Sequence, residues 1–182
     1  MILFVAGGSA SGKSAYAQEQ AAALQMQDSP GEKPLIYAAT MSDQSPESLA
    51  RILRHQEQRQ GLAHETRECF SLEALEALIT EASGRTVLFD CLSGFVADVL
   101  FADARGEQAV LRIPRLLEKL GASCRHLVIV SDLVFSDGSR YDVSTENYIK
   151  HLGICCRAAA AAADRAVEVV CGIPVTIKGI TE

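Results

Sequence analysis

The chain has 182 residues, of which 48% are hydrophobic and 22% are charged, a length and balance typical of one globular domain. Its formal net charge of −6 at pH 7 argues against a nonspecific nucleic-acid binder, which normally carries a basic surface. No apolar run approaches the ~20 residues of a membrane-spanning helix, and no signal-peptide pattern precedes the first motif. We therefore expect a soluble, cytoplasmic protein with one domain over residues 1–182, without a membrane span or a nucleic-acid partner.

The first predicted element is a buried strand over residues 2–6 (ILFVA), which runs directly into a glycine-rich segment. Residues 7–14 (GGSASGKS) fit the phosphate-loop pattern G-x-x-x-x-G-K-[ST]. Glycines let such a loop approach the phosphates, so that backbone N–H groups and the N-terminus of the next helix point at the anion. Lys13 is expected to pair with the β- and γ-phosphates, and Ser14 to supply a hydroxyl to Mg²⁺. A glycine- and serine-rich turn could match by chance, but the strand before it and the helix predicted from Lys13 favour the phosphate loop.

Further along the chain, short runs rich in β-branched residues alternate with longer helical patterns. The runs 34–39, 86–90 and 126–131 are apolar almost throughout, which is typical of buried parallel strands. Segments 71–82 and 108–122 carry apolar residues at helical spacing. This alternation predicts a parallel sheet with helices packed on both faces.

One of these strands ends in a carboxylate. Asp90 closes the run TVLFD and is placed to reach a metal ion, or its waters, beside the phosphates. Many buried strands end in Asp, so this residue alone is a weak signal. Together with the glycine-rich loop, it predicts a P-loop nucleotide-binding domain.

The C-terminal part predicts a helix and a hairpin. Residues 155–166 (CCRAAAAAADRA) are strong helix formers, and their alanine run indicates a closely packed face. Two apolar runs around a tight Cys171–Gly172 turn predict an antiparallel hairpin at one sheet edge, and residues 28–33 and 136–141 are expected loops. The fold class is thus α/β, a P-loop NTPase-like three-layer sandwich with a mostly parallel sheet and a C-terminal antiparallel edge hairpin.

The six cysteines form no CxxC pair and have no metal-ligand spacing with the four histidines. Several lie inside apolar runs such as VLFDCL and VEVVCG, where cysteine behaves as a small buried hydrophobe. We expect reduced thiols, with disulfides as the less favoured alternative, at Cys69, Cys91, Cys124, Cys155, Cys156 and Cys171.

The segment SLARILRHQEQRQG, residues 48–61, places Arg51, His55 and Arg59 on roughly one face of a helix. The simplest interpretation is a solvated polar face. The chemical alternative is a nucleophile, because an imidazole with a pKa near ~6.5 is mostly neutral at pH 7. Flanking guanidiniums would then bind the phosphates that it attacks. The other histidines lack such settings and are expected on the surface or in loops: His64, His126 and His151.

Several motifs occur in the order and approximate spacing of one protein family: GGSASGKS, IYAAT, RILRHQEQR, Thr66-Arg67-Glu68, VLFDCL and AAAADRAVEVVCGIPVTIKG. With these motifs the chain resembles, over nearly its whole length, the bifunctional adenosylcobinamide kinase/adenosylcobinamide-phosphate guanylyltransferase family of cobalamin biosynthesis. The resemblance implies an enzyme that phosphorylates the corrinoid adenosylcobinamide with ATP or GTP. It then transfers GMP from GTP to adenosylcobinamide phosphate through a guanylylated histidine. The resemblance also implies a homo-oligomer, a trimer.

The resemblance places the guanylylated histidine at His55, which we expect to be catalytic together with Lys13. The metal, Mg²⁺, is expected at Ser14 and Asp90, directly or through water. The nucleotide-binding positions expected from the loop motif and the resemblance are Gly7, Gly8, Ser9, Ala10, Ser11, Gly12, Lys13, Ser14, Thr40, Met41, Ser42, Gln56, Glu57, Gln58, Arg59, Glu68 and Asp90.

The chain departs from the family pattern at some positions. Ala10 stands where the family usually has Arg, and Asp132 stands where it typically has Asn. Three interpretations of the function remain open. The first is the two-step transferase, with both activities or with one weakened, and the second is a P-loop small-molecule kinase in which His55 only binds phosphate. The third is a nucleotide-binding protein without catalytic activity.

Overall fold

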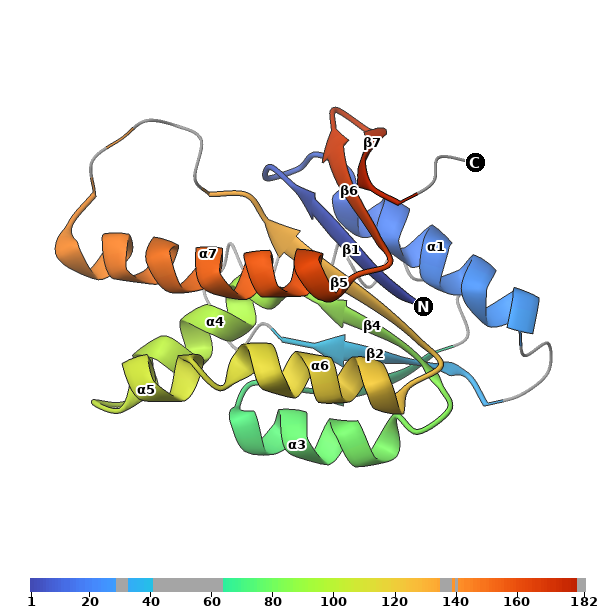
Figure 1. The fold of residues 1–182 in the computed structure, drawn as a ribbon, viewed down its shortest axis with the longest axis horizontal. Helices are drawn as coiled ribbons and strands as arrows, with labels where there is room; N and C mark the ends of the chain where they lie inside the picture. Colours follow the sequence, from blue (N-terminus) through green and yellow to red (C-terminus); the bar gives the residue numbers. More distant parts are fainter. Residues whose placement is uncertain (29–32, 41–63, 135–138, 140, 180–182) are drawn as a thin grey trace.

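A seven-stranded sheet with strand order β3-β2-β4-β5-β1-β6-β7 forms the centre of the structure (Figure 1). The computed structural model describes residues 1–28, 33–40, 64–134, 139 and 141–179. The strands are β1 (Ile2–Gly7), β2 (Leu35–Ala39), β3 (His64–Glu68), β4 (Thr86–Asp90), β5 (His126–Asp132), β6 (Arg165–Val170) and β7 (Ile173–Lys178). The helices are α1 (Lys13–Asp28), α3 (Leu72–Glu81), α4 (Leu92–Phe101), α5 (Gly106–Val110), α6 (Ile113–Ser123) and α7 (Val143–Ala162).

The strand pairing brings the carboxyl ends of most strands to one edge of the sheet. Strands β1 to β6 pair in parallel, and only β6 with β7 is antiparallel. In this register Gly7 lies beside Asp132 of β5 on one side and Val169 of β6 on the other. Ligands of open parallel sheets bind outside these carboxyl ends, so this edge positions the candidate site.

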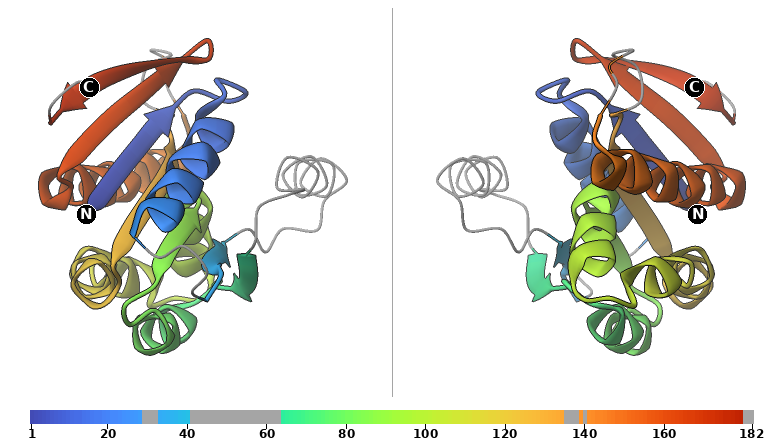
Figure 2. Two further views of the ribbon diagram at one scale, coloured as in Figure 1. Left: turned by 90° about the vertical axis from the view of Figure 1, so that its right-hand side faces the viewer. Right: turned by 90° about the vertical axis from the view of Figure 1, so that its left-hand side faces the viewer.

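Each face of the sheet carries its own core. Alternate residues of β1 point to opposite faces: Phe4 packs in one cluster with α3, α4, α6 and α7, and Leu3 packs in the other with α1. Figure 1 shows the first group of helices in front of the sheet, and Figure 2 shows the β6–β7 hairpin beside β1 at one end. The predicted three-layer α/β architecture with an antiparallel edge hairpin is therefore confirmed.

The region predicted as one helix over 108–122 consists of two helices, α5 and α6. Pro114 is the reason, because proline has no N–H to donate and fits only in the first turn of a helix. It stands in the first turn of α6, which then buries Ile113, Leu116 and Leu120 against the sheet. Helix α3 agrees closely with its predicted range of 71–82, and Ser71 caps it by accepting from the backbone N–H of Ala74.

The predicted helix over 155–166 is only the last part of the longer α7. This helix begins after Asp142, whose carboxylate accepts from the N–H groups of Ser144 and Thr145. It ends at Ala162, and Ala166 lies instead in β6, where it pairs with Phe4 of β1. Pairing of β6 with β1 thus overrides the local helix propensity.

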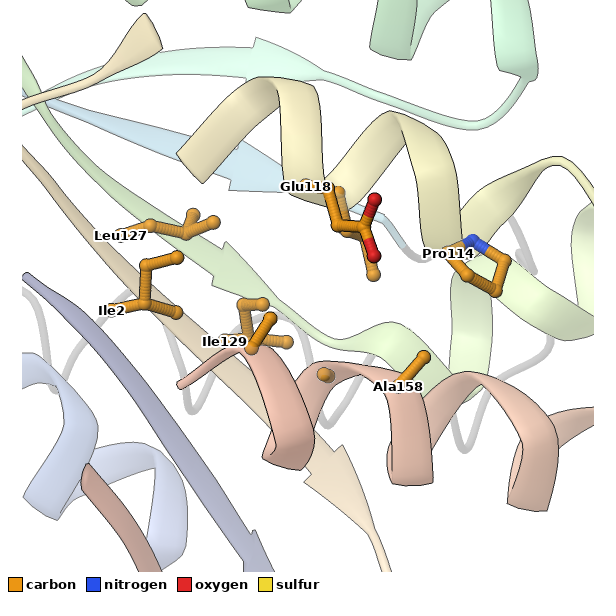
Figure 3. Close-up of a pocket in the computed structure, with 9 residues that line it drawn as sticks. Ile2, Pro114, Glu118, Leu127, Ile129 and Ala158 are labelled. Atoms are coloured by element: carbon orange, nitrogen blue, oxygen red, sulfur yellow. The ribbon is translucent and has the colours of Figure 1, made fainter. Parts of the chain in front are cut away.

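In the alanine run of α7, Ala159 belongs to the core and Ala160 packs against it, whereas Ala161 and Ala162 are exposed. Ala158, Ala159 and Ala162 line a small, mainly apolar gap between α6 and α7, where Ile2 and Leu127 lie at one end between the two helices (Figure 3). The gap offers about 10 Å³ to water, which is the scale of a single water site. It is therefore a packing defect rather than a substrate pocket.

Two of the histidines expected on the surface are buried, which corrects that prediction. His126 and His151 are each 7% exposed, and the ring of His151 lies 2.9 Å from the carbonyl oxygen of Asn147. His126 lies in β5 within the sheet and His151 lies in α7, which packs on the sheet. Their burial therefore follows from tertiary packing. His64 lies half-buried in β3.

The six cysteines form no disulfide, and only Cys171 is exposed. Within the described residues, no helix is long and apolar enough to cross a membrane.

Candidate functional site

The glycine-rich loop connects β1 to α1 at the carboxyl edge of the sheet. Ala10 and Gly12 have positive φ angles of 55° and 91°, and the N–H of Ser11 donates to the Gly8 carbonyl at 3.2 Å. A Cβ atom at Gly7 would lie 2.4 Å from Ser11 Oγ and 2.7 Å from the Val169 carbonyl oxygen. The tight fold of the loop therefore requires glycine at position 7.

Several features make this loop suitable for an anion. The first turn of α1 contains no acidic residue, so the partial positive charge of the helix N-terminus is not offset there. The buried hydroxyl of Ser11 has no hydrogen-bond partner among the described residues. Phosphate oxygens would accept from the Ser11 hydroxyl and would be attracted by the N-terminus of α1.

Lys13, the first residue of α1, is almost completely buried beneath the loop, with 3% of its surface exposed. Its ammonium donates to the Gly8 carbonyl at 3.0 Å and forms an ion pair with Asp132 Oδ1 at 2.6 Å. The side chain is therefore held in the cradle by a carboxylate at the end of β5.

Asp132 belongs to a short polar network at the ends of β4 and β5. The hydroxyl of Ser93 donates to Asp132 Oδ2 at 2.9 Å and lies 3.1 Å from Cys91 Sγ. Burial, together with the negative charges of Asp90 and Asp132, raises the pKa of the Cys91 thiol to about 11. Cys91 is consequently a neutral thiol at pH 7 and not a nucleophile.

The structure brings Thr40 and Asp90 together at the ends of β2 and β4. The N–H of Thr40 donates to the Asp90 carbonyl at 3.3 Å, and its hydroxyl donates to the Cys91 carbonyl at 2.6 Å. Tyr37 donates its hydroxyl to Asp90 Oδ2 at 3.4 Å, and both Thr40 and Asp90 are buried. Glu68 ends the neighbouring β3, where its side chain is exposed.

The turn of the β6–β7 hairpin contacts the glycine-rich loop on the side of the sheet away from β5. The sequence analysis did not predict this contact. The N–H of Gly172 at the hairpin turn donates to the Ser11 carbonyl at 2.8 Å. The Gly172 Cα would lie 3.4 Å from a Cβ at Gly12. The tight Cys171–Gly172 turn was visible in the sequence, but its contact with the loop follows only from the pairing of β6 with β1.

Other predicted site residues lie outside the part of the chain that the structure describes. These are His55, Met41, Ser42 and residues 56–59.

A metal ion at this site would need ligands from the nucleotide phosphates as well as from the protein. No cluster of three or more His, Cys, Asp or Glu that could hold a metal is found among the described residues. Ser14 and Asp90 offer a hydroxyl and a carboxylate, and Mg²⁺ is commonly bound by one or two such groups plus waters and phosphate oxygens. The residues present therefore suit Mg²⁺ that arrives with a nucleotide.

The parallel sheet, the glycine-rich loop and the buried lysine at the start of α1 define a P-loop protein, the class that binds nucleotide phosphates. The sequence matches the CobU family, described as cobinamide kinase / cobinamide phosphate guanyltransferase, over residues 3–177. The chain belongs to this family of nucleotide-dependent transferases of cobalamin biosynthesis. No curated protein matches the chain.

Proposed function

We propose that this protein, as one P-loop domain, is a two-step transferase that phosphorylates adenosylcobinamide and then transfers GMP to adenosylcobinamide phosphate. The observation that carries the proposal is the buried Lys13 beneath a loop whose backbone and Ser11 hydroxyl suit the binding of phosphate. The chain also belongs to the cobinamide kinase / cobinamide phosphate guanyltransferase family.

In the first step, a hydroxyl oxygen of adenosylcobinamide attacks the γ-phosphorus of ATP or GTP, the nucleoside diphosphate leaves, and the hydroxyl proton passes to solvent. The residues of the loop would contribute mainly charge stabilisation. Backbone N–H groups and the ammonium of Lys13 offset the negative charge on the β- and γ-phosphates. Mg²⁺, when bound at Ser14 and Asp90, would neutralise further phosphate charge.

In the second step, the imidazole nitrogen of His55 attacks the α-phosphorus of GTP, and pyrophosphate leaves. A phosphate oxygen of adenosylcobinamide phosphate then attacks the same phosphorus, which breaks the P–N bond. Adenosylcobinamide-GDP leaves and the free histidine returns. A covalent intermediate divides one difficult transfer into two easier steps.

The remaining nucleotide contacts in this proposal come from around the loop. Thr40 and Asp90 lie together at the same edge of the sheet, which suits contact with one nucleotide. The other proposed contact residues are Met41, Ser42, Gln56, Glu57, Gln58, Arg59 and Glu68.

The experiment is labelling with GTP that carries a radioactive α-phosphate, in the presence of Mg²⁺. We expect protein-bound label that is lost in acid and retained in base, because a phosphoramidate has this stability. His55→Ala should abolish the label, whereas His64→Ala, which changes another histidine, should retain it. Label in His55→Ala at the wild-type level would refute the guanylyl-histidine.

A second candidate function is nucleotide binding without transfer. The ion pair between Lys13 and Asp132 favours it, because a lysine engaged by a carboxylate is less available to phosphates. GTP binding without any label would support this candidate, and label from the γ-phosphate alone would support a kinase.

We also propose that the protein works in the cytoplasm as a homotrimer. Strand β7 supports self-association, because its edge position leaves Ile173, Val175 and Ile177 exposed, and exposed apolar strips mark interaction surfaces. Sedimentation equilibrium measures the mass, and a monomer at micromolar concentration would refute the oligomer.

A further inference from the structure

The ion pair between Lys13 and Asp132 occupies the place where a phosphate would bind. Lys13 is expected to reach the β- and γ-phosphates, yet its ammonium lies 2.6 Å from Asp132 Oδ1 and 3.0 Å from the Gly8 carbonyl. The side chains of Lys13 and Asp132 are only 4% and 15% exposed. Little water therefore screens this interaction.

The carboxylate of Asp132 is fixed from the side of α4. Ser93 is buried, donates its hydroxyl to Asp132 Oδ2 at 2.9 Å and accepts from the Asp132 N–H at 3.4 Å. The Ser93 carbonyl in turn accepts from the hydroxyl of Tyr148 on α7 at 3.1 Å. Two helices thus hold the carboxylate in the orientation that faces Lys13.

We propose that Asp132 is a positioning residue that holds the ammonium of Lys13 against the loop before nucleotide arrives and competes with the phosphates for it. The proposal rests on the nucleotide binding of the proposed function. A triphosphate brings several negative charges close to the same ammonium, and the fixed carboxylate repels them. Binding therefore requires the phosphates to displace or outweigh Asp132.

The consequence is that the wild-type protein binds phosphates more weakly than its loop would allow. Replacing the carboxylate by the isosteric amide in Asp132→Asn removes the competing charge and keeps the shape. The ammonium of Lys13 can then interact with the phosphates without competition from this carboxylate.

The experiment is calorimetric titration of inorganic tripolyphosphate, and separately of GTP with Mg²⁺, into wild type and Asp132→Asn. We expect Kd for both ligands to fall at least about tenfold in Asp132→Asn. Glu76→Gln is the matched control. It removes one negative charge from an exposed ion pair with Arg112 on the α3 side, and its Kd should stay at the wild-type value.

A second readout separates positioning from a merely structural role. In the absence of ligand, the modification rate of the Lys13 amine by an amine reagent should rise in Asp132→Asn, with an unchanged far-ultraviolet circular dichroism spectrum. If Asp132→Asn does not fold, the ammonium signal of Lys13 is followed by NMR in the wild type. It must shift when tripolyphosphate is added, and an unchanged signal would overturn the proposal.

The outcomes also separate this proposal from the proposed function. An unchanged or higher Kd in Asp132→Asn overturns the role of Asp132, whatever the histidine labelling shows. Tighter binding without histidine label supports that role and removes the transferase. If neither wild type nor Asp132→Asn binds phosphate, both proposals fail.

Discussion

At the scale of single residues, Lys13 carries the most consequential contact of the site. Its buried ammonium forms an ion pair with Asp132 Oδ1 at 2.6 Å. Breaking such a pair on one side leaves a charge with little solvation, which costs more than the intact pair contributes. The pair therefore couples the stability of the fold to the integrity of the phosphate loop.

Lys13→Met should lower the free energy of unfolding by about 2 kcal/mol, because it removes one side of a mostly buried ion pair with Asp132. Adding Asp132→Asn to that variant should recover most of the loss. Urea unfolding followed by circular dichroism measures both, since the chain contains no tryptophan for fluorescence. A double variant no more stable than Lys13→Met would contradict this assignment.

At the scale of elements, the β6–β7 hairpin does more than close the edge of the sheet. Cys171 and Gly172 both have positive φ angles, 50° and 82°, as a two-residue type I′ turn requires. The same turn donates from the Gly172 N–H to the Ser11 carbonyl. The hairpin thus fixes one side of the phosphate loop.

Gly172→Ala should lower both stability and phosphate affinity. A Cβ there meets no atom within 4 Å, so the cost is left-handed backbone strain of about 1 kcal/mol, which shifts the donor away from Ser11. Gly84→Ala is a matched control, since Gly84 also has a positive φ, of 67°, and open space around its Cβ.

Urea unfolding and tripolyphosphate titration would be measured on both variants. We expect a similar stability loss in the two, but weaker binding only in Gly172→Ala. Equal affinities would show that the hairpin does not position the loop.

At the scale of the whole molecule, the two core layers bury thiols from several elements. Burial raises the pKa of Cys69 and Cys155 to about 12, and that of Cys91 and Cys124 to about 11, from an ordinary value of 9.0. These raised values mean that the folded state binds thiol protons more tightly than the unfolded chain does.

The contribution of these thiols to stability should therefore be complete below pH 9 and be lost as the pH rises from 9 towards 12, because the unfolded thiols ionise first. Each thiol contributes a slope of about 1.4 kcal/mol per pH unit. Urea unfolding with a reducing agent at pH 8 and pH 10 measures this slope. Cys155→Ala should reduce the slope by one thiol, and an unchanged slope would contradict the assignment.

The local sequence determined the phosphate loop, the buried strands and the tight Cys171–Gly172 turn. Each of these depends on neighbouring residues: glycines that permit positive φ, apolar runs that fit a buried strand and a lysine at the start of a helix. The motif order also predicted the family that the comparison confirmed.

Only the tertiary structure decided how distant segments meet. Asp132 faces Lys13 because β5 pairs with β1, and Gly172 reaches Ser11 because β6 pairs with β1 on the other side. The same pairing ended α7 at Ala162 despite the helix propensity of its alanine run. Strand order is set by how the whole chain buries its apolar surface, and no short window of sequence contains that information.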